Sequence, residues 1–281
     1  LFVIASMFFI FASRLHLPLW QLAQEGRSRI GHPIRASSAL SHADGPLSAL
    51  FGKEVLAFVR DTRGMLWFGF ILLIWAFAVG ANRILVLGLA DERVALGNSA
   101  GLVTGIAFAS SVYFVAMAAL RFAFPAFSME RKKGWLLGSA PIDQGIIFVV
   151  KLGFFAFVLS VLALGFGTLE MALFALPPNA EMVFDAAIVV AVFFITILAL
   201  ALGAIYPNRD TDDPELLSTT APGLAFIGLA LAYGAFGAFA LARFVGKGDP
   251  IVIGIALVAS IAGAVMLLAR ARRALARLEF S

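Results

Sequence analysis

The residues whose types and spacing could most directly carry out chemistry form an acidic cluster, Asp210, Asp212 and Asp213. An Asp-x-Asp pair can hold a divalent cation and, through it, a nucleotide-sugar diphosphate, because hard cations prefer carboxylate oxygens. Two neighbouring carboxylates supply fewer oxygens than such a cation takes. Pro207 and Pro214 on either side are typical of a turn. We therefore expect an acidic turn here and no metal site.

The three histidines, His16, His32 and His42, lie in one polar stretch. Their spacing is irregular, and they belong to no H-E-x-x-H pattern. The chain has no Cys, which excludes disulfides and thiolate metal sites. These histidines are expected to be solvated loop residues rather than metal ligands.

A phosphate-binding loop for ATP requires the pattern G-x-x-x-x-G-K-[ST]. The nearest fragment is Gly246-Lys247-Gly248, which lacks the first glycine and the hydroxyl residue after the lysine. No other catalytic motif is present either. We therefore expect that the chain is not an enzyme and binds no cofactor, and that any ATP it depends on is hydrolysed by another chain.

Coupling to an ion gradient usually places carboxylates or histidines inside a helix bundle. Glu170 and Asp185 lie near the outer ends of apolar runs, and Lys151 lies near an inner end, from which its amine could reach the lipid headgroups. This distribution counts against an ion-coupled secondary transporter, which stays open as an alternative. A membrane-embedded glycosyl or lipid transferase using Asp210 and Asp212 is a weaker alternative.

The elements that position these residues are membrane helices. Hydrophobic residues make up 62% of the 281 residues and charged residues 14%, against about 25% charged residues in an average soluble domain. The apolar runs lack the alternation of a membrane barrel. Six uncharged runs reach the roughly 20 residues that a spanning helix needs: 64–82, 94–120, 152–169, 186–208, 216–242 and 250–269. We predict an all-α, polytopic membrane bundle that forms a single transmembrane domain over 1–281.

The two ends of the chain flank these six spans. Residues 1–13 are apolar without a basic start, which predicts the end of a truncated membrane helix rather than a signal peptide. The polar segment 14–63 is expected to be cytoplasmic. Within it, apolar residues recur at helical spacing over 47–60, which indicates an amphipathic helix at the membrane surface. Residues 270–281 form a basic tail.

Basic residues predict the orientation of the bundle. Seventeen of the 21 Lys and Arg residues fall in the segment 14–63, the region 121–151, the loop at Arg209 and the C-terminal tail. The other side holds four: Arg83, Arg93, Arg243 and Lys247. Since cytoplasmic loops carry the excess of basic residues, the first group and the C-terminus are expected in the cytoplasm.

Small residues indicate where helices approach closely. Gly101 and Gly105 form a G-x-x-x-G pattern, and Gly234, Gly237 and Ala238 add small residues to another span. In lipid, such residues let helix backbones come into contact. The pattern predicts tight packing, either within the chain or between two copies.

The segment from Phe124 to Leu137 connects two predicted spans and carries a mixed set of charges, with Glu130 ahead of three basic residues and Trp135 after them. One interpretation is a cytoplasmic loop with an interfacial tryptophan, which is common in membrane proteins. The other is a short cytoplasmic helix that docks on a partner and transmits its movement.

Three segments resemble a known family. The first is Lys53-Glu54 through Arg60-Asp61. The second runs from Arg121-Phe122-Ala123-Phe124-Pro125 through Ser128-Met129-Glu130 and Trp135 to Ser139-Ala140-Pro141-Ile142 and Lys151. The third is Gly203-Ala204-Ile205-Tyr206-Pro207 with Asp210, Asp213-Pro214-Glu215 and Ser218. They resemble the membrane subunits of ATP-binding-cassette exporters of the type-2 permease class, in particular bacterial permeases, and their order and spacing agree with the topology predicted from charge.

The resemblance implies a permease subunit in the bacterial plasma membrane that pairs with a separate cytoplasmic ATPase chain. It also implies a second permease unit, or an N-terminal half missing from this chain. Membrane lipid is a further expected partner, and nucleic acid is not. The ATPase contact is expected at Glu130, Arg131, Lys132, Lys133 and Trp135, where three consecutive basic residues depart from the family's pattern. A second contact is expected at Lys53, Glu54, Arg60 and Asp61. The substrate is not indicated.

Overall fold

The computed structural model describes residues 46–91, 96–129, 144–174, 178–207 and 214–278. These residues are almost entirely helical and include no strand, so the all-α prediction is confirmed. They belong to two compact units, Leu1–Trp67 and Phe68–Ser281. The predicted helix at 1–13 and the polar stretch up to residue 45 lie outside the described residues.

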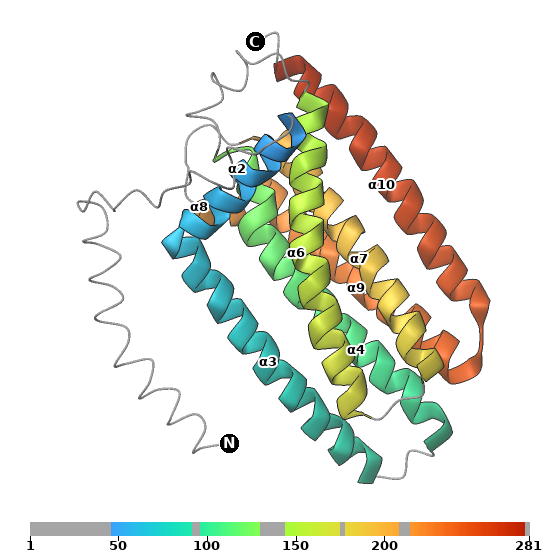
Figure 1. Cartoon of the computed structure of the whole chain (residues 1–281). Helices are drawn as coiled ribbons and strands as arrows, with labels where there is room; N and C mark the ends of the chain where they lie inside the picture. Colours follow the sequence, from blue (N-terminus) through green and yellow to red (C-terminus); the bar gives the residue numbers. More distant parts are fainter. Residues whose placement is uncertain (1–45, 92–95, 130–143, 175–177, 208–213, 279–281) are drawn as a thin grey trace, which may run out of the picture. The chain divides into compact units, whose positions relative to one another are not determined.

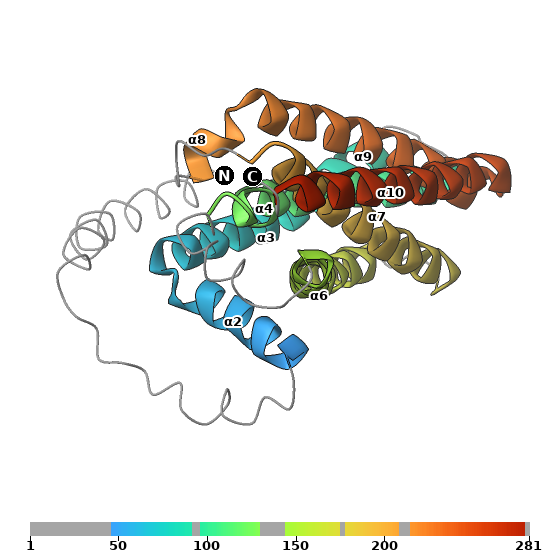
Figure 2. The same ribbon diagram turned by 90° about the horizontal axis from the view of Figure 1, so that it is seen from above.

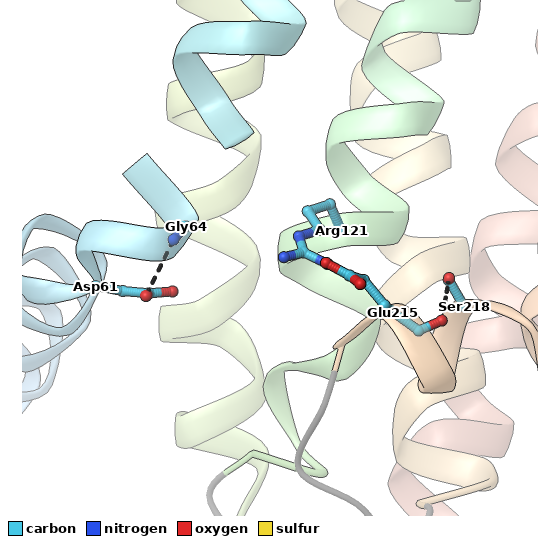
Figure 3. A network of polar contacts seen from close by, with 5 residues as sticks. All are labelled: Asp61, Gly64, Arg121, Glu215 and Ser218. Atoms are coloured by element: carbon cyan, nitrogen blue, oxygen red, sulfur yellow. Dashed lines mark hydrogen bonds and ion pairs between the residues drawn. The ribbon is translucent and has the colours of Figure 1, made fainter. Parts of the chain in front are cut away.

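The first unit contains α2 (Pro46–Arg60) and the first turns of α3 (Thr62–Asp91). The amphipathic helix predicted at 47–60 is therefore present as α2, and its apolar Leu47 and Phe51 are exposed. Asp61 alone separates the two helices. Its Oδ1 accepts a hydrogen bond from the backbone N–H of Gly64 at 3.0 Å, which caps the first turn of α3 (Figure 3).

Six helices of the described residues are long and apolar enough to cross a membrane. They are α3, α4 (Leu96–Ala118) with its continuation to Ala126, α6 (Gln144–Leu173), α7 (Pro178–Ile205), α9 (Ala221–Lys247) and α10 (Pro250–Leu278) (Figure 1). Each satisfies its backbone hydrogen bonds internally, as a segment in hydrocarbon must. The chain is a multi-pass integral membrane protein.

Several helices extend beyond the uncharged runs from which they were predicted. α7 begins at Pro178 rather than 186 and contains Glu181 and Asp185, while α3 continues past Arg83 to Asp91. α10 continues through most of the basic tail to Leu278. Charged side chains near the ends of a span reach water and headgroups, so they do not end the helix.

The run 216–242 is not one helix. The short helix α8 (Pro214–Ser218) is followed by Thr219 and Thr220, and α9 starts at Ala221. Thr220 is the N-cap of α9, and its Oγ1 accepts a hydrogen bond from the backbone N–H of Gly223 at 3.4 Å. Hydroxyl residues next to Pro222 therefore start a new helix where hydropathy alone predicted continuity.

The other end of α9 explains the fragment Gly246-Lys247-Gly248. Gly248 has φ of 68°, in the left-handed region, and its N–H donates to the Phe244 carbonyl at 2.8 Å. A glycine in this conformation commonly ends a helix because it has no Cβ. The fragment is a helix terminus, not part of a phosphate-binding loop.

The predicted G-x-x-x-G pattern packs within the chain, where α4 makes its most extensive contact with α9. A Cβ added at Gly105 would lie 3.0 Å from the Ala238 carbonyl oxygen, and one at Gly101 would meet the Ala242 carbonyl. From the α9 side, Gly234 faces Val112 of α4. The absence of side chains lets the two backbones approach, which maximises dispersion contact in lipid.

The helix α10 lies at one side of the second unit in Figure 1 and packs against α7 and α9, which it overlaps when seen from above in Figure 2. Only 6% of its most apolar window is buried within the protein, against 67% for α4 and for α7. Its exposed side chains, such as Ile251, Val258 and Val265, are large and apolar. This surface is suited to contact lipid.

The orientation predicted from charge can be tested by cysteine labelling, because the chain has no cysteine of its own. We expect Asn179→Cys, exposed at the start of α7, to react with a membrane-impermeant maleimide in intact cells. Arg273→Cys, exposed near the end of α10, is expected to react only after the cells are permeabilised. A permeant maleimide should label both variants, and the reverse pattern of protection would contradict the orientation.

Candidate functional site

The end of α4 departs from α-helical geometry. The π-helix η1 (Ala119–Ala123) is followed by the 3-10 helix η2 (Phe124–Ala126), and the N–H of Phe124 donates to the Ala119 carbonyl. Pro125 accounts for the change, since it has no N–H to donate to Arg121 and its ring would clash with that carbonyl in an α-helix. Short π-segments are frequent at functional sites.

The C-terminal end of α7 packs directly against this turn. A Cβ added at Gly203 would collide with the Phe124 carbonyl oxygen and lie 3.2 Å from the carbonyl carbon. Ala204 beside it is also buried. The backbones of two segments distant in sequence are therefore in contact, and both belong to the segments that carry the family resemblance.

An ion pair joins the same turn to α8. Arg121 Nη1 lies 3.5 Å from Glu215 Oε1, with the arginine side chain 12% exposed and the glutamate side chain 47% exposed (Figure 3). Ser218 Oγ donates to the Glu215 carbonyl oxygen at 2.7 Å. We call residues 119–129, 203–206 and 214–220 the α4–α8 junction. A pair whose glutamate is this exposed contributes at most about 1 kcal/mol, and it connects α8 to the end of α4.

Lys151 is nearly fully buried, with 1% of its surface exposed. The expectation that it reaches the lipid headgroups is wrong. Because α6 begins at Gln144, Lys151 lies two turns inside the helix, and its Nζ is 5.7 Å from the centroid of the Phe127 ring. Phe127 in turn stacks on Phe148 at 5.9 Å. The ammonium group thus faces the α4–α8 junction, where the aromatic ring partly replaces its hydration.

A second buried polar contact lies between α3 and α6. Glu170 is fully buried, and its Oε1 accepts a hydrogen bond from Asn82 Nδ2 at 2.6 Å. Its Oε2 has no hydrogen-bond partner among the described residues. On the same two helices, Trp75 stacks on Phe166 at 4.6 Å. Glu170 lies near the helix end that the sequence indicated, but it is turned into the protein. Ionisable groups inside spans are candidates for function by default.

A family model described as "Putative ATP-binding cassette" matches residues 2–243. The chain belongs to this family. The match includes the whole α4–α8 junction, four of the six spans in full and most of a fifth, α9. Neither the curated proteins nor the solved structures contain a match to the chain. With its six spans, this member of the ATP-binding-cassette family is a membrane component related to ATP-binding-cassette transporters.

The predicted ATPase-contact residues of this family member fall into two groups. Glu130, Arg131, Lys132, Lys133 and Trp135 lie outside the described residues, in the segment that follows Met129 of the α4–α8 junction. Their role stays a prediction. The acidic residues Asp210, Asp212 and Asp213 and the three histidines also lie outside, and the described residues contain no cluster suited to a metal ion.

The second predicted contact lies in the first unit. Lys53 Nζ and Glu54 Oε1 are 3.4 Å apart. Arg60 is exposed in the last turn of α2, where its positive charge interacts favourably with the negative end of the helix dipole. Asp61 has a structural role as the cap of α3. The role of these residues as a partner contact stays a prediction.

The sequence did not indicate the pairing of Arg121 with Glu215 or of Asn82 with Glu170. All four residues stand at or near the ends of apolar runs, which marks them as polar groups close to the membrane surface. Opposite charge at the same predicted side of the membrane was the available signal for Arg121 and Glu215. Only the packing of the helices shows which side chains meet.

Gly203→Val is expected to destabilise the α4–α8 junction, because the new side chain would overlap the Phe124 carbonyl, a fixed backbone group. Overpacking of this kind costs about 1–3 kcal/mol. The measurement is the apparent melting temperature of the detergent-purified protein. Gly153→Val is the matched control, since its Cβ meets nothing within 4 Å. Equal stability of the two variants would show that the contact between α7 and η2 is absent.

Proposed function

We propose that the chain is the permease subunit of an ATP-binding-cassette exporter, driven by a separate ATPase chain. The observation that supports this most strongly is where the family match falls. Residues 2–243 are dominated by membrane-spanning helices, and the 281 residues contain no phosphate-binding loop. A chain of this kind supplies the pathway, whereas the partner supplies ATP hydrolysis.

The α4–α8 junction is suited to receive the movement of the ATPase. α4, α7 and α8 all end or begin there, joined by the contact of Gly203 with Phe124 and the ion pair of Arg121 with Glu215. A partner that binds the segment after Met129 would displace a turn connected to several spans at once. ATP-driven closure of the ATPases would then shift the bundle between inward-open and outward-open arrangements, because the closed ATPase pair binds one arrangement more tightly than the other.

The family resemblance supports the remaining parts of this proposal. Two permease units build the pathway together, in the plasma membrane of a bacterium, and each contacts an ATPase on the cytoplasmic side. Trp135 would be the apolar anchor of that contact, as aromatic residues often are at interfaces. Glu130 and the basic residues Arg131, Lys132 and Lys133 would add charge complementarity.

The proposed contact is testable by co-purification. The chain is expressed with the ATPase encoded beside its gene, extracted in detergent, and purified through a tag on its C-terminus. We expect the ATPase to co-purify with the unaltered chain, and the double variant Glu130→Ala, Trp135→Ala to retain at most about one tenth as much, since loss of an anchor residue costs 1.4 kcal/mol or more.

The matched control for this experiment is Glu181→Ala with Met182→Ala. It removes an acid and a large exposed apolar side chain at the opposite end of the bundle. This control variant should co-purify with as much ATPase as the unaltered chain does. If the ATPase never co-purifies, the permease proposal fails. If it co-purifies equally with both double variants, the contact lies elsewhere.

A second candidate function is an ion-coupled transporter, and burial of Glu170 is the observation that favours it. The carboxylate is shielded from solvent and has a single hydrogen-bond donor, Asn82, among the described residues. Carboxylates in this situation serve as proton sites in gradient-driven transporters. The favoured proposal instead gives Glu170 the structural role of joining α3 to α6 through Asn82.

The energy source separates the two candidates. Inverted membrane vesicles that contain the chain and its ATPase are tested for uptake of a panel of lipophilic dyes and fluorescent lipids. We expect uptake that needs ATP hydrolysis, survives a protonophore and is retained in Glu170→Gln, because an amide can still accept the hydrogen bond from Asn82. Uptake that runs without ATP, stops with the protonophore and is lost in Glu170→Gln would favour ion coupling.

A further inference from the structure

A cavity of about 410 Å³ opens between α7, α9 and α10. This volume is within the range of small-molecule sites. Its walls are apolar and rich in small residues, including Ala186 and Ala187 of α7, Gly237 and Ala240 of α9, and Gly254 and Ala256 of α10. The small side chains leave space where larger ones would have closed the three helices on one another.

The cavity is about one lipid leaflet deep. Along α10 it extends from Pro250 to Ser260, which corresponds to about 15 Å at the helical rise per residue. The hydrocarbon core of a bilayer is roughly 30 Å thick, so each leaflet contributes about half of that. The shallow end lies where α7 and α10 begin and α9 ends, the side that the charge distribution predicts to face outward.

The deep end of the cavity carries two hydroxyl groups that form a hydrogen bond with each other. The oxygens of Tyr233 and Ser260 are 3.0 Å apart, and Ser260 Oγ also donates to the Ala256 carbonyl at 2.7 Å. Because the serine has one proton to give, the tyrosine must donate to the serine oxygen. Neither hydroxyl then has a proton left for a ligand. The cavity thus favours a hydrocarbon chain over a polar molecule.

The cavity is continuous with the lipid-facing surface of α10. Three of its large apolar side chains, Met182, Phe236 and Leu257, are also among the exposed residues of the bundle. Water gains little in an apolar space without several polar partners. Within a bilayer, the molecule that reaches this opening is a lipid.

Positive charge lies beyond the shallow end. Arg243 follows Phe236 by two turns and so lies on the same face of α9, and Lys247 is exposed at the end of that helix. The Nε of Arg243 is buried without a hydrogen-bond partner among the described residues. A phosphate group at this level would supply an acceptor and an opposite charge.

We propose that the cavity binds one acyl chain of a membrane phospholipid from the outer leaflet, with the headgroup phosphate beside Arg243 and Lys247. The site goes beyond the proposed permease function and does not depend on it, since it rests on three helices that need no ATPase. The ligand class is a phospholipid, one acyl chain of which occupies the cavity while its anionic phosphate lies beyond the shallow end.

The test uses a phospholipid with a photoreactive diazirine near the end of one acyl chain. The purified protein in nanodiscs that contain this lipid is irradiated, and adducts are mapped by mass spectrometry. We expect adducts concentrated on peptides that contain Met182 and Tyr233. Gly254→Phe should reduce them about tenfold, because the ring occupies the space of the chain. A Cβ at Gly254 meets nothing within 4 Å, so the variant should fold.

The matched control is Gly228→Phe, an exposed α9 position outside the cavity with equally open space. It should leave the adducts unchanged, and adducts near the exposed Phe77 of α3 should be the same in all variants. Adducts spread evenly over exposed surfaces, or unaffected by Gly254→Phe, would overturn the proposal. So would efficient disulfide dimers of Gly254→Cys, which would show that a second copy covers the cavity.

A second variant tests the headgroup. Arg243→Gln should weaken labelling by the photoreactive phospholipid several-fold, because a charged hydrogen bond to phosphate is lost. Labelling by a photoreactive fatty alcohol of equal length should stay unchanged. Equal loss with both probes would overturn the assignment of the phosphate to Arg243.

Discussion

The close approach of α4 to its neighbours is the interaction on which the bundle depends. In lipid there is no hydrophobic force that drives one apolar helix onto another, so helices associate through van der Waals contact and hydrogen bonds. Gly101 and Gly105 bring α4 onto the backbone of α9 near one end, and Gly203 brings α7 onto the Phe124 carbonyl at the other. Each contact needs a missing side chain, and together they fix α4 as the helix around which α7 and α9 are placed.

The number and type of the helices could be predicted from the sequence because the bilayer allows few alternatives. An apolar run of sufficient length must satisfy its backbone internally, and this requirement made all six spans predictable. Helix ends were less predictable. A charge at the membrane surface ends an apolar run without ending the helix, as Asp185 in α7 and Arg270 in α10 illustrate. Thr219 and Thr220 had the opposite effect and divided an apolar run into α8 and α9.

The polar contacts could not be predicted in the same way, because their partners come from different helices. The sequence places Lys151, Glu170 and Arg121 near membrane surfaces, but rotation of each helix about its axis decides whether the side chain meets lipid or protein. Lys151 and Glu170 both face inward, to Phe127 and Asn82 respectively. The distortion at η1 had a visible cause in Pro125, yet proline alone permits several outcomes. In the folded chain the Phe124 carbonyl at the end of the π-turn lies against Gly203.

The helices α9 and α10 are attached to the second unit in different ways. α9 is held to α4 by backbone contact, so the two move together. α10 has no such contact with α4; it is fixed to α7 where Gly263 lies against the Phe194 ring, with a Cβ there only 2.9 Å from that ring. From this point towards Pro250 the small residues leave the cavity open. Tyr233 of α9 stacks on Phe194 of α7 at 4.4 Å and shares a hydrogen bond with Ser260 of α10. A shift of α7 transmitted from Gly203 would therefore reach α9 and α10 together at the deep end of the cavity. α10 therefore exposes the largest share of its apolar surface to lipid and is attached to the bundle mainly through α7 and α9.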